Sequence, residues 1–238
     1  MALPRLNESP EYELTIPSMD KKVSFRPFLV KEQKVLLMAF ESKDKDQILK
    51  AMLNTIKACV ELQDVDVRTL PTFDIDYIFT QIRAKSVGET TNIMVKCDCK
   101  DKHENKVSVN LSDIELPSGI KKDVIIPLTD TISVGMKYPT YSSIFTNIKD
   151  NSSETQTVMN FLVNCIDTVQ TENELISMND ETHQEKTSFI ESLNSEQFNK
   201  LTEYLNNVPQ LTTSVSYSCE KCGKENISEL KGLEDFFL

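Results

Sequence analysis

The chain has 238 residues, of which 39% are hydrophobic and 26% charged, and its formal net charge is −11. These proportions are typical of a globular protein with a buried core and exclude an intrinsically disordered chain. With only 5 glycines and 2 histidines, the sequence contains no glycine-rich phosphate-binding loop and no set of three histidines for a metal ion. The composition therefore disfavours most enzyme classes.

The net charge and the apolar runs of the sequence also predict the kind of partner and the compartment. The excess of acidic residues disfavours binding to a phosphate backbone, which proteins neutralise with clustered Lys and Arg. The segment from Met1 to Leu14 lacks the continuous apolar core of a signal peptide, so export is not expected. The longest strictly apolar run, from Leu36 to Phe40, is far shorter than the roughly 20 residues of a membrane-spanning helix. We expect a soluble chain.

The N-terminal part predicts a β-hairpin followed by helices. Apolar and polar residues alternate in residues 12–16 and again in residues 23–28, with a turn between them. Residues 28–42 are dense in apolar residues and good helix formers, which predicts a mostly buried helix. Asp44 and Gln47 have the spacing of a capping box and predict the start of a second helix.

Apolar spacing predicts which faces of the next two helices are buried. The stripe of the second helix comprises Leu49, Leu53, Ile56 and Val60, flanked by Ile48, Met52 and Cys59. A third helix is expected to begin at Asp74 and to end near Gly88. Its buried face comprises Ile75, Ile78, Phe79 and Ile82.

The remainder of the chain alternates between strand and helix patterns. Residues 91–97 and 107–111 predict a second hairpin, and residues 124–126 and 132–136 predict short strands. The strongest helical stripe comprises Val158, Phe161, Leu162, Cys165, Ile166 and Val169. A polar connector (171–185), two helices (184–193 and 195–208) and a final strand around residues 213–217 are expected to follow.

Four of the six cysteines form two pairs at the ends of predicted strands. Cys97 pairs with Cys99, and Cys219 pairs with Cys222, which Gly223 follows. Such pairs are typical of two hairpin turns whose thiolates share one tetrahedral Zn²⁺. A glycine after the second thiolate allows the positive φ that turns the chain beneath a metal. We expect a structural Zn²⁺ site with these four cysteines as ligands.

Alternatives to the four-cysteine zinc site stay open. The first pair has one intervening residue where zinc ribbons more often have two, so His103 is a spare fourth ligand. Metal-free thiols, disulfides, and redox or iron–sulfur chemistry are the other interpretations, and disulfides are disfavoured because cytosolic thiols stay reduced. Cys59 and Cys165 lie among helical apolar positions and are expected to be small buried hydrophobes. No side chain is assigned a catalytic role.

The last ten residues concentrate apolar side chains, including the neighbours Phe236 and Phe237. Terminal residues normally fray unless a contact holds them. We therefore expect this segment to dock, either onto the cysteine-containing hairpins of the same chain or into a partner protein.

Several segments taken together resemble a known family. They are residues 23–32 (VSFRPFLVKE), residues 73–89 (ending in KSVGE), the two cysteine pairs, and residues 232–237. In their order and spacing they resemble the baseplate hub assembly proteins of T-even type tailed bacteriophages, over nearly the whole chain. The resemblance implies a non-enzymatic protein that helps to build the central hub of the contractile-tail baseplate, and it supplies no catalytic residue.

The predicted fold is α+β, helical in its N-terminal and central parts, with a β-rich, zinc-ribbon-like knot formed by two distant hairpins. Residues 1–90 are expected to hold the first hairpin and helices, and residues 91–238 the knot, unless the two form one continuous domain. The expected partners are other phage baseplate hub proteins, with no nucleic acid and no membrane span. Assembly in the host bacterial cytoplasm is expected, while persistence in the virion tail baseplate and the oligomeric state are left open.

Two other function classes compete with this prediction. One is a zinc-ribbon nucleic-acid-binding or transcription-associated factor, which predicts salt-sensitive binding to DNA or RNA. The other is a metal-dependent or thiol enzyme, in which single cysteine replacements abolish turnover and leave the fold intact. A structural site predicts instead that loss of Cys219 or Cys222 destabilises the protein.

Overall fold

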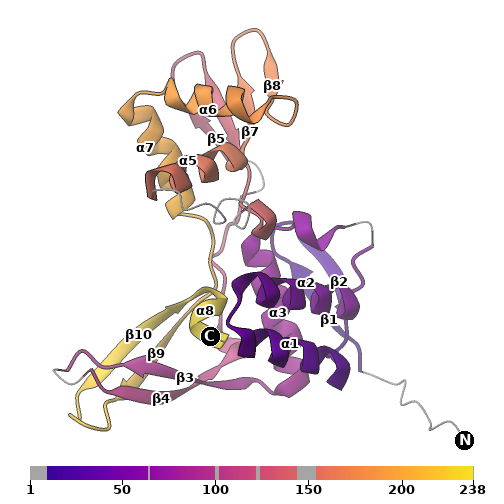
Figure 1. Cartoon of the computed structure of the whole chain (residues 1–238), viewed down its shortest axis with the longest axis vertical. Helices are drawn as coiled ribbons and strands as arrows, with labels where there is room; N and C mark the ends of the chain where they lie inside the picture. Colours follow the sequence, from indigo (N-terminus) through magenta and orange to yellow (C-terminus); the bar gives the residue numbers. More distant parts are fainter. Residues whose placement is uncertain (1–9, 64, 100–101, 122–123, 144–153, 238) are drawn as a thin grey trace, which may run out of the picture. The chain divides into compact units, whose positions relative to one another are not determined.

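The computed structural model describes residues 10–63, 65–99, 102–121, 124–143 and 154–237, and the chain divides into two compact units (Figure 1). The first unit comprises Met1–Val67, Phe73–Ser118 and Pro209–Leu238, and the second comprises Arg68–Thr72 and Gly119–Val208. Both combine helices with antiparallel strands, so the predicted α+β class is confirmed. The residues on both sides of position 90 belong to the first unit. The predicted division into residues 1–90 and 91–238 stays a prediction.

The first unit begins with the predicted hairpin and three helices. The elements are β1 (Tyr12–Ile16), β2 (Lys21–Phe25), α1 (Val30–Ser42), α2 (Lys45–Cys59) and α3 (Thr72–Val87). The carboxylate of Asp44 accepts hydrogen bonds from the N–H groups of Asp46 (2.9 Å) and Gln47 (3.2 Å), and this confirms the predicted start of α2. The buried face predicted for α3 is also confirmed, since Ile75, Ile78, Phe79 and Ile82 are all buried.

One prediction about helix burial was wrong, and another was wrong in part. Helix α1 is not mostly buried, because only Glu32, Leu36 and Ala39 are buried along it. In α2 the flanking residues Ile48, Met52 and Cys59 are buried, whereas Leu49 and Leu53 of the predicted stripe are only half-buried. The other two members of the predicted stripe, Ile56 and Val60, are buried as expected. Both candidate stripes of α2 have helical spacing and are apolar, so periodicity alone does not choose between them.

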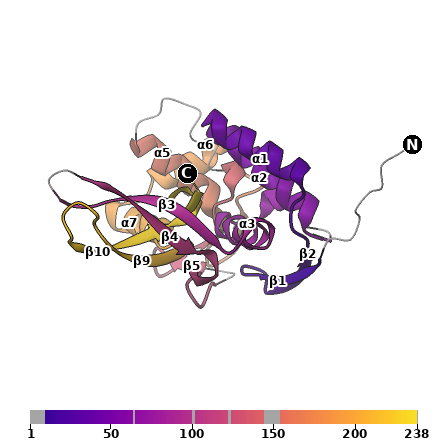
Figure 2. The ribbon, with the colours of Figure 1, turned by 90° about the horizontal axis from the view of Figure 1, so that it is seen from below.

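The second part of the first unit consists of two hairpins and a short helix. The elements are β3 (Thr90–Lys96) with β4 (Glu104–Asn110), β9 (Thr212–Ser218) with β10 (Glu225–Lys231), and α8 (Gly232–Phe237). The two hairpins extend in the same direction, and their turns lie at the same end (Figure 2). Their inner faces share a core whose buried members include Ile93, Val95, Val109, Leu111, Val215 and Leu230.

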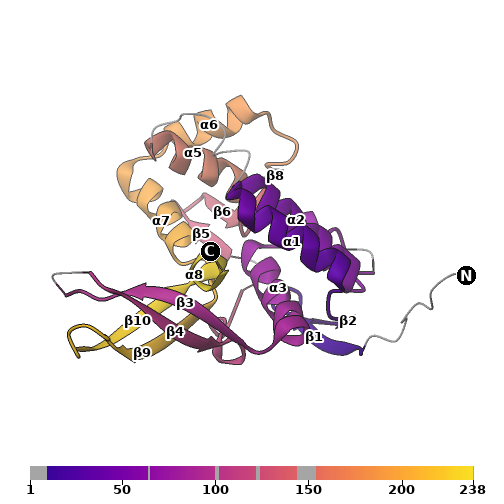
Figure 3. The same ribbon diagram turned by 60° about the horizontal axis from the view of Figure 1, so that its bottom comes forward.

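The C-terminal helix docks within its own unit. Gly232 has a φ of 67°, which turns the chain out of β10 and back over the hairpins. Phe236 is 1% exposed and belongs to the core shared by the hairpins, and α8 contacts both β3 and β10 (Figure 3). Of the two expected docking modes, the structure shows the intramolecular one for Phe236. The side chain of Phe237 lies outside the described residues.

The second unit packs helices against a small sheet. Its strands pair in the order β5 (Val124–Pro127), β6 (Ser133–Met136), β7 (Ile166–Gln170) and β8 (Leu175–Ser177), all antiparallel. The helices are α5 (Glu154–Cys165), α6 (His183–Glu191) and α7 (Ser195–Asn206). The predicted strands near 124 and 132 and the two helices after residue 183 are therefore confirmed.

One helix in the second unit was predicted too long. The stripe from Val158 was expected to stay helical as far as Val169, but α5 ends at Cys165 and β7 begins at Ile166. Ile166 and Val169 are both buried, although they are three residues apart, a spacing that also occurs on one face of a helix. In β7 the spacing arises because the pairing with β6 shifts register between Gly135 and Met136. The polar connector expected at residues 171–185 also contains a strand, β8.

A buried carboxylate joins the first hairpin to α3. Asp74 is fully buried, and it accepts hydrogen bonds from the backbone N–H of Ser18 (3.0 Å) and from the Ser18 hydroxyl. Burial raises the pKa of Asp74 to about 6, although the two hydrogen bonds from Ser18 act in the opposite direction. The β1–β2 turn is thus fixed to a group that binds its proton more tightly in the folded protein than in the unfolded chain.

This proton affinity predicts a pH dependence of stability. Because the pKa of Asp74 rises on folding, the folded state binds more protons than the unfolded state between about pH 4 and pH 6, so the free energy of unfolding contributed by this group should fall as pH rises through that window. Asp74→Asn should remove this contribution, while Glu115→Gln, at an exposed carboxylate of the same unit, should not. Urea unfolding of the three proteins across the window measures it. Parallel pH profiles for wild type and Asp74→Asn would contradict the assignment.

Candidate metal centre

The four paired cysteines meet at the turns of the two hairpins of the first unit. Cys97 directly follows β3 and Cys99 lies in the β3–β4 turn, while Cys219 directly follows β9 and Cys222 lies in the β9–β10 turn. All four Sγ atoms lie within 4.8 Å of one another. The structure therefore brings together the four sulfur atoms that the sequence singled out, from positions far apart along the chain.

The spacing of the sulfur atoms fits one tetrahedral ion. The Sγ atoms of Cys97 and Cys222 are 3.8 Å apart. Metal–sulfur bonds of about 2.3 Å in a tetrahedral zinc site place neighbouring sulfur atoms about 3.8 Å apart. A disulfide would need about 2.05 Å, and none of the six cysteines, all of which lie in the described part of the chain, forms one. Geometry and donor type thus both suit a thiolate-bound metal ion.

Tight backbone turns hold the thiols in place. In the second turn, the N–H of Gly223 donates to the carbonyl of Cys219 (2.9 Å), and Gly223 has the positive φ (67°) that the sequence predicted. In the first turn, the N–H of Cys97 donates to the carbonyl of His103, and that of Lys102 donates to the carbonyl of Cys99, both at 2.9 Å. Lys102 also has a positive φ, 45°. Each pair of sulfur atoms is therefore fixed by its own turn.

The two buried thiols have opposite electrostatic environments. The backbone N–H of Cys222, assisted by that of Lys221, lowers the pKa of Cys219 to about 6, against the effect of burial. Burial raises the pKa of Cys97 to about 11, and its Sγ donates to the side-chain oxygen of Asn226 (3.6 Å). Cys219 is thus held ready as a thiolate, whereas Cys97 needs a nearby positive charge in order to ionise.

Polar side chains tie the two turns together around the sulfur atoms. Asn105 is buried, and its side chain accepts from the N–H of Glu220 (2.9 Å) and donates to the carbonyl of His103 (3.0 Å). The hydroxyl of Tyr217 donates to the carbonyl of Lys96 (3.0 Å). These residues were missed from the sequence. The one available signal was that Asn105 shares the inward-facing side of its strand with apolar positions.

The other candidate ligands stand apart from this cluster. The side chain of His103 does not belong to the group of donor atoms that gathers here among the described residues; its backbone carbonyl serves the turn instead. Cys59 and Cys165 are buried in other parts of the fold, and burial raises the pKa of Cys59 to about 11 and that of Cys165 to about 12. Their predicted role as small buried hydrophobes is confirmed.

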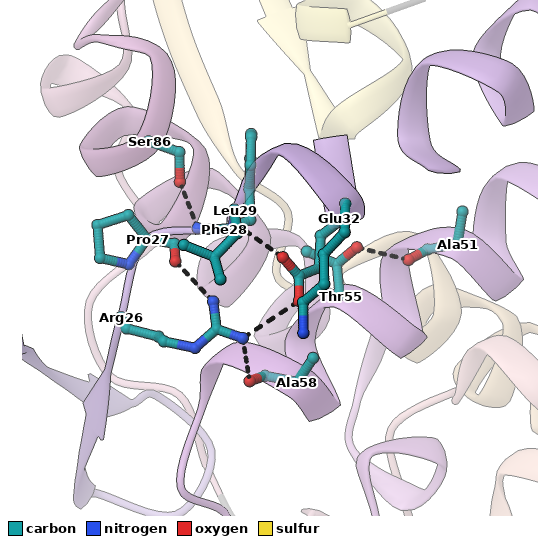
Figure 4. Close-up of polar contacts among 10 residues, drawn as sticks. Arg26, Pro27, Phe28, Leu29, Glu32, Ala51, Thr55, Ala58 and Ser86 are labelled. Carbon is teal, nitrogen blue, oxygen red and sulfur yellow. Dashed lines mark hydrogen bonds and ion pairs between the residues drawn. The ribbon is translucent and has the colours of Figure 1, made fainter. Parts of the chain in front are cut away.

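A second polar cluster fixes the start of α1 (Figure 4). The guanidinium of Arg26 donates to the carboxylate of Glu32 (3.2 Å) and to the carbonyl of Ala58 (2.9 Å). Burial acts to raise the pKa of Glu32, but the hydrogen bonds from the Leu29 N–H and from Arg26 outweigh it and lower that pKa below its ordinary value. The ion pair is partly buried, and Arg26 joins α1 to the end of α2, which gives the pair a structural role.

The same region also contacts the end of α3. The N–H of Phe28 donates to the hydroxyl of Ser86 (2.9 Å), which in turn donates to the carbonyl of Ile82 (2.6 Å). Residues 23–32 and 73–89, two of the segments on which the family resemblance was based, therefore touch each other in the fold (Figure 4). Their hydrogen bonds position helices and leave no arrangement of acid, base and nucleophile.

Comparison with known proteins decides the family. A family model described as "T4 bacteriophage base plate protein" matches residues 9–238. The chain belongs to this family. It is also 22% identical over 228 residues to the "Baseplate hub assembly protein gp26" of Enterobacteria phage T4, a match that covers 95% of this chain and 98% of that protein. No solved structure matches the chain.

Membership of the baseplate family confirms the resemblance noted in the sequence and supports a structural or assembly role in a phage tail. It does not favour the alternative of a nucleic-acid-binding factor. Within the described ranges, every helix is too short or too polar to cross a bilayer.

The environments of the cysteines predict their reactivity. In native, metal-free protein, a thiol-alkylating reagent should modify exposed Cys222 first. Cys59, Cys97 and Cys165 should react only after unfolding, because burial and a raised pKa leave little thiolate. Mass spectrometry of the labelled peptides, with urea-unfolded protein as the control, locates each modification. Rapid labelling of Cys165 in the folded protein would count against this arrangement.

Proposed function

We propose that this protein is a non-enzymatic component of phage tail assembly that helps to build the central hub of the baseplate through protein–protein contacts. The family match across residues 9–238 is the observation that carries the proposal. The relative named as a baseplate hub assembly protein supports the hub as the place of action. On this proposal the protein acts in the host bacterial cytoplasm during assembly, and its partners are other baseplate hub proteins.

The same proposal assigns Zn²⁺ to the sulfur cluster, with Cys97, Cys99, Cys219 and Cys222 as ligands. Four thiolates complete a tetrahedral shell and leave no open position for a substrate, so the ion would join the two hairpins in a zinc-ribbon-like knot. The cluster would carry a net negative charge once all four thiols ionise. Backbone N–H groups directed at Cys219 and lysines near the cysteines in the sequence offset that charge.

The charge of the chain also supports a protein partner. A formal net charge of −11 opposes association with a polyanion. In a low-salt mobility-shift assay, the protein is therefore expected to leave the migration of DNA and RNA unchanged. Salt-sensitive binding in that assay would contradict the proposal.

Metal binding predicts a stoichiometry and a specific effect on stability. Protein purified under reducing conditions should contain about one Zn²⁺ per chain, and Cys222→Ser should lose it. Because Cys222 is exposed, this replacement should change stability little in the presence of a chelator and lower the melting temperature markedly in the presence of Zn²⁺. Elemental analysis and thermal unfolding with and without chelator measure both effects.

His103→Ala provides the matched control for the zinc prediction. The imidazole is close in sequence to the first pair and is absent from the sulfur cluster, so this variant should keep both the metal and the melting temperature. Loss of zinc from His103→Ala, or equal stability of wild type and Cys222→Ser with Zn²⁺ present, would contradict the assignment of four cysteine ligands.

The assembly role predicts a defined set of partners. Tagged protein recovered from phage-infected cells should bring down one or more baseplate hub proteins, and the complex should survive raised salt because apolar contacts depend little on ionic strength. Each hub protein is then tested by pairwise co-expression with the full chain. Recovery of host nucleic-acid machinery alone, with no hub protein in any pairwise test, would overturn the role.

A further inference from the structure

A groove of about 740 Å³ runs along one edge of β3 in the first unit. Six consecutive residues of that strand, 91–96, line one side of it, together with residues 228–230 of β10. Residues of α1 and α3 also line it, and α8 contributes Phe236. The family match assigns no function to this groove, which lies beside the sheets and includes none of the four clustered cysteines.

The edge of β3 that lines the groove has main-chain groups that can form hydrogen bonds with a ligand. In the described part of the chain β3 pairs only with β4. The bonds from the Cys97 N–H to His103 and from the Leu111 N–H to Glu89 show that odd-numbered residues of β3 form the hydrogen-bonded pairs. The N–H and C=O groups of Asn92 and Met94 therefore point away from β4. No hydrogen bond in the described residues uses them.

The strand β10 presents a second, shorter edge to the same groove. The bonds from the Cys219 N–H to Lys224 and from the Gly232 N–H to Leu211 place even-numbered residues of β10 in its hydrogen-bonded pairs. The main-chain groups of Glu229 consequently point outward. Two residues further on, the outward N–H of Lys231 is already bonded to the carboxylate of Asp235 (2.8 Å), so α8 closes this edge at its end.

Several apolar side chains that line the groove are exposed. Leu37 on α1 is 54% exposed, Val87 on α3 57%, and Met94 on β3 59%. The buried core residues Ile93 and Phe236 also line the groove. A groove that combines exposed apolar side chains with polar groups is typical of a binding site for another protein segment.

The charges along the groove are balanced. Arg83 and Lys96 are matched by Glu229 and Asp235, so the groove has no excess of positive charge to attract nucleic acid or another polyanion. The groups available for binding are the main-chain groups at the strand edge and the exposed apolar side chains. An extended polypeptide with apolar side chains at alternate positions matches both, because it can bond to the edge with its backbone and bury every second side chain.

We propose that an extended segment of a baseplate hub protein binds in this groove by adding a strand to the free edge of β3. This inference rests on the proposed assembly function, which it refines by naming the surface and the conformation of the partner. Main-chain hydrogen bonds to Asn92 and Met94 supply affinity, and contacts with Leu37 and Phe236 select apolar side chains of the segment.

A matched pair of proline variants tests the edge. Asn92 and Ser108 lie directly opposite each other in the β3–β4 hairpin, both are exposed, and both point their N–H groups away from the hairpin. Asn92 faces the groove, whereas Ser108 lies on the other edge. Proline is tolerated at outward edge positions and removes one donor. Asn92→Pro should therefore weaken binding, and Ser108→Pro should not.

The probes are overlapping synthetic peptides tiled across the baseplate hub proteins of the same phage, titrated by fluorescence anisotropy into the full chain. We expect at least one peptide to bind, with a loss of about tenfold or more for Asn92→Pro, as for a lost hydrogen bond in a buried strand pairing. Ser108→Pro should stay within about twofold of wild type. Leu37→Lys, which alters an exposed side chain outside the strand ladder, gives a second test should Asn92→Pro fail to fold.

The outcomes separate this inference from the assembly role. If whole hub proteins bind the chain but no tiled peptide does, or if Asn92→Pro and Leu37→Lys bind as wild type does, the groove proposal fails and the assembly role stands. If no hub protein binds in any form, the assembly role fails as well. A dimer of the chain alone that Asn92→Pro dissociates would overturn the proposal in favour of a second copy as the occupant. A peptide that binds as a helix would also overturn it.

Discussion

The first unit depends on contacts between two hairpins that are far apart in the sequence. Most of the second unit, Gly119–Val208, lies between β4 and β9 along the chain, so the early and late parts of the first unit must meet after a long loop is closed. The entropy lost in closing that loop grows only logarithmically with its length, but some set of contacts must offset it. The shared core of the hairpins, the α8 helix and the cluster of four sulfur atoms are those contacts.

The contacts that hold the two hairpins together differ in how precisely they fix the hairpins against each other. Phe236 and its apolar neighbours exclude water over a large area but fix no particular register between the hairpins. The side chain of Asn105 and the hydroxyl of Tyr217 are directional and set how one turn lies against the other. With the turns aligned in this way, four sulfur atoms at tetrahedral spacing follow from backbone geometry. The metal centre proposed here therefore builds on an arrangement that protein contacts already define.

Much of this fold was predictable because its local signals are strong. Strict alternation identified the hairpins, and the cysteine pairs identified the turns that meet, since few other roles explain two such pairs beside predicted strands. Prediction failed where two patterns fit equally well. The choice between the Ile48 and Leu49 faces of α2 depends on neighbouring elements, and the switch from helix to strand at Ile166 depends on pairing with β6. Neither is encoded locally. Asn105 was missed because a polar residue on a strand has no distinctive spacing.

The failed prediction for α1 has a different origin. Its composition is that of a buried helix, yet the chain leaves Val30, Leu37 and Met38 largely exposed. A disagreement between local sequence and the fold that surrounds it is expected mainly at functional positions. Of these three, Leu37 lines the groove that also contains the outward edge of β3. The two observations are independent, since one concerns a side chain and the other concerns main-chain groups.

The strand β3 connects the two proposed features. Cys97 directly follows it in the sulfur cluster, and the main-chain groups of Asn92 and Met94 line the groove a few residues earlier. Anchoring the end of an edge strand restricts its fraying, so the edge is held in an extended form before a partner arrives. Preorganisation of this kind reduces the entropy lost on binding and so strengthens it without any new contact. On these proposals the metal ion supports the partner site through β3 and need not touch the partner itself.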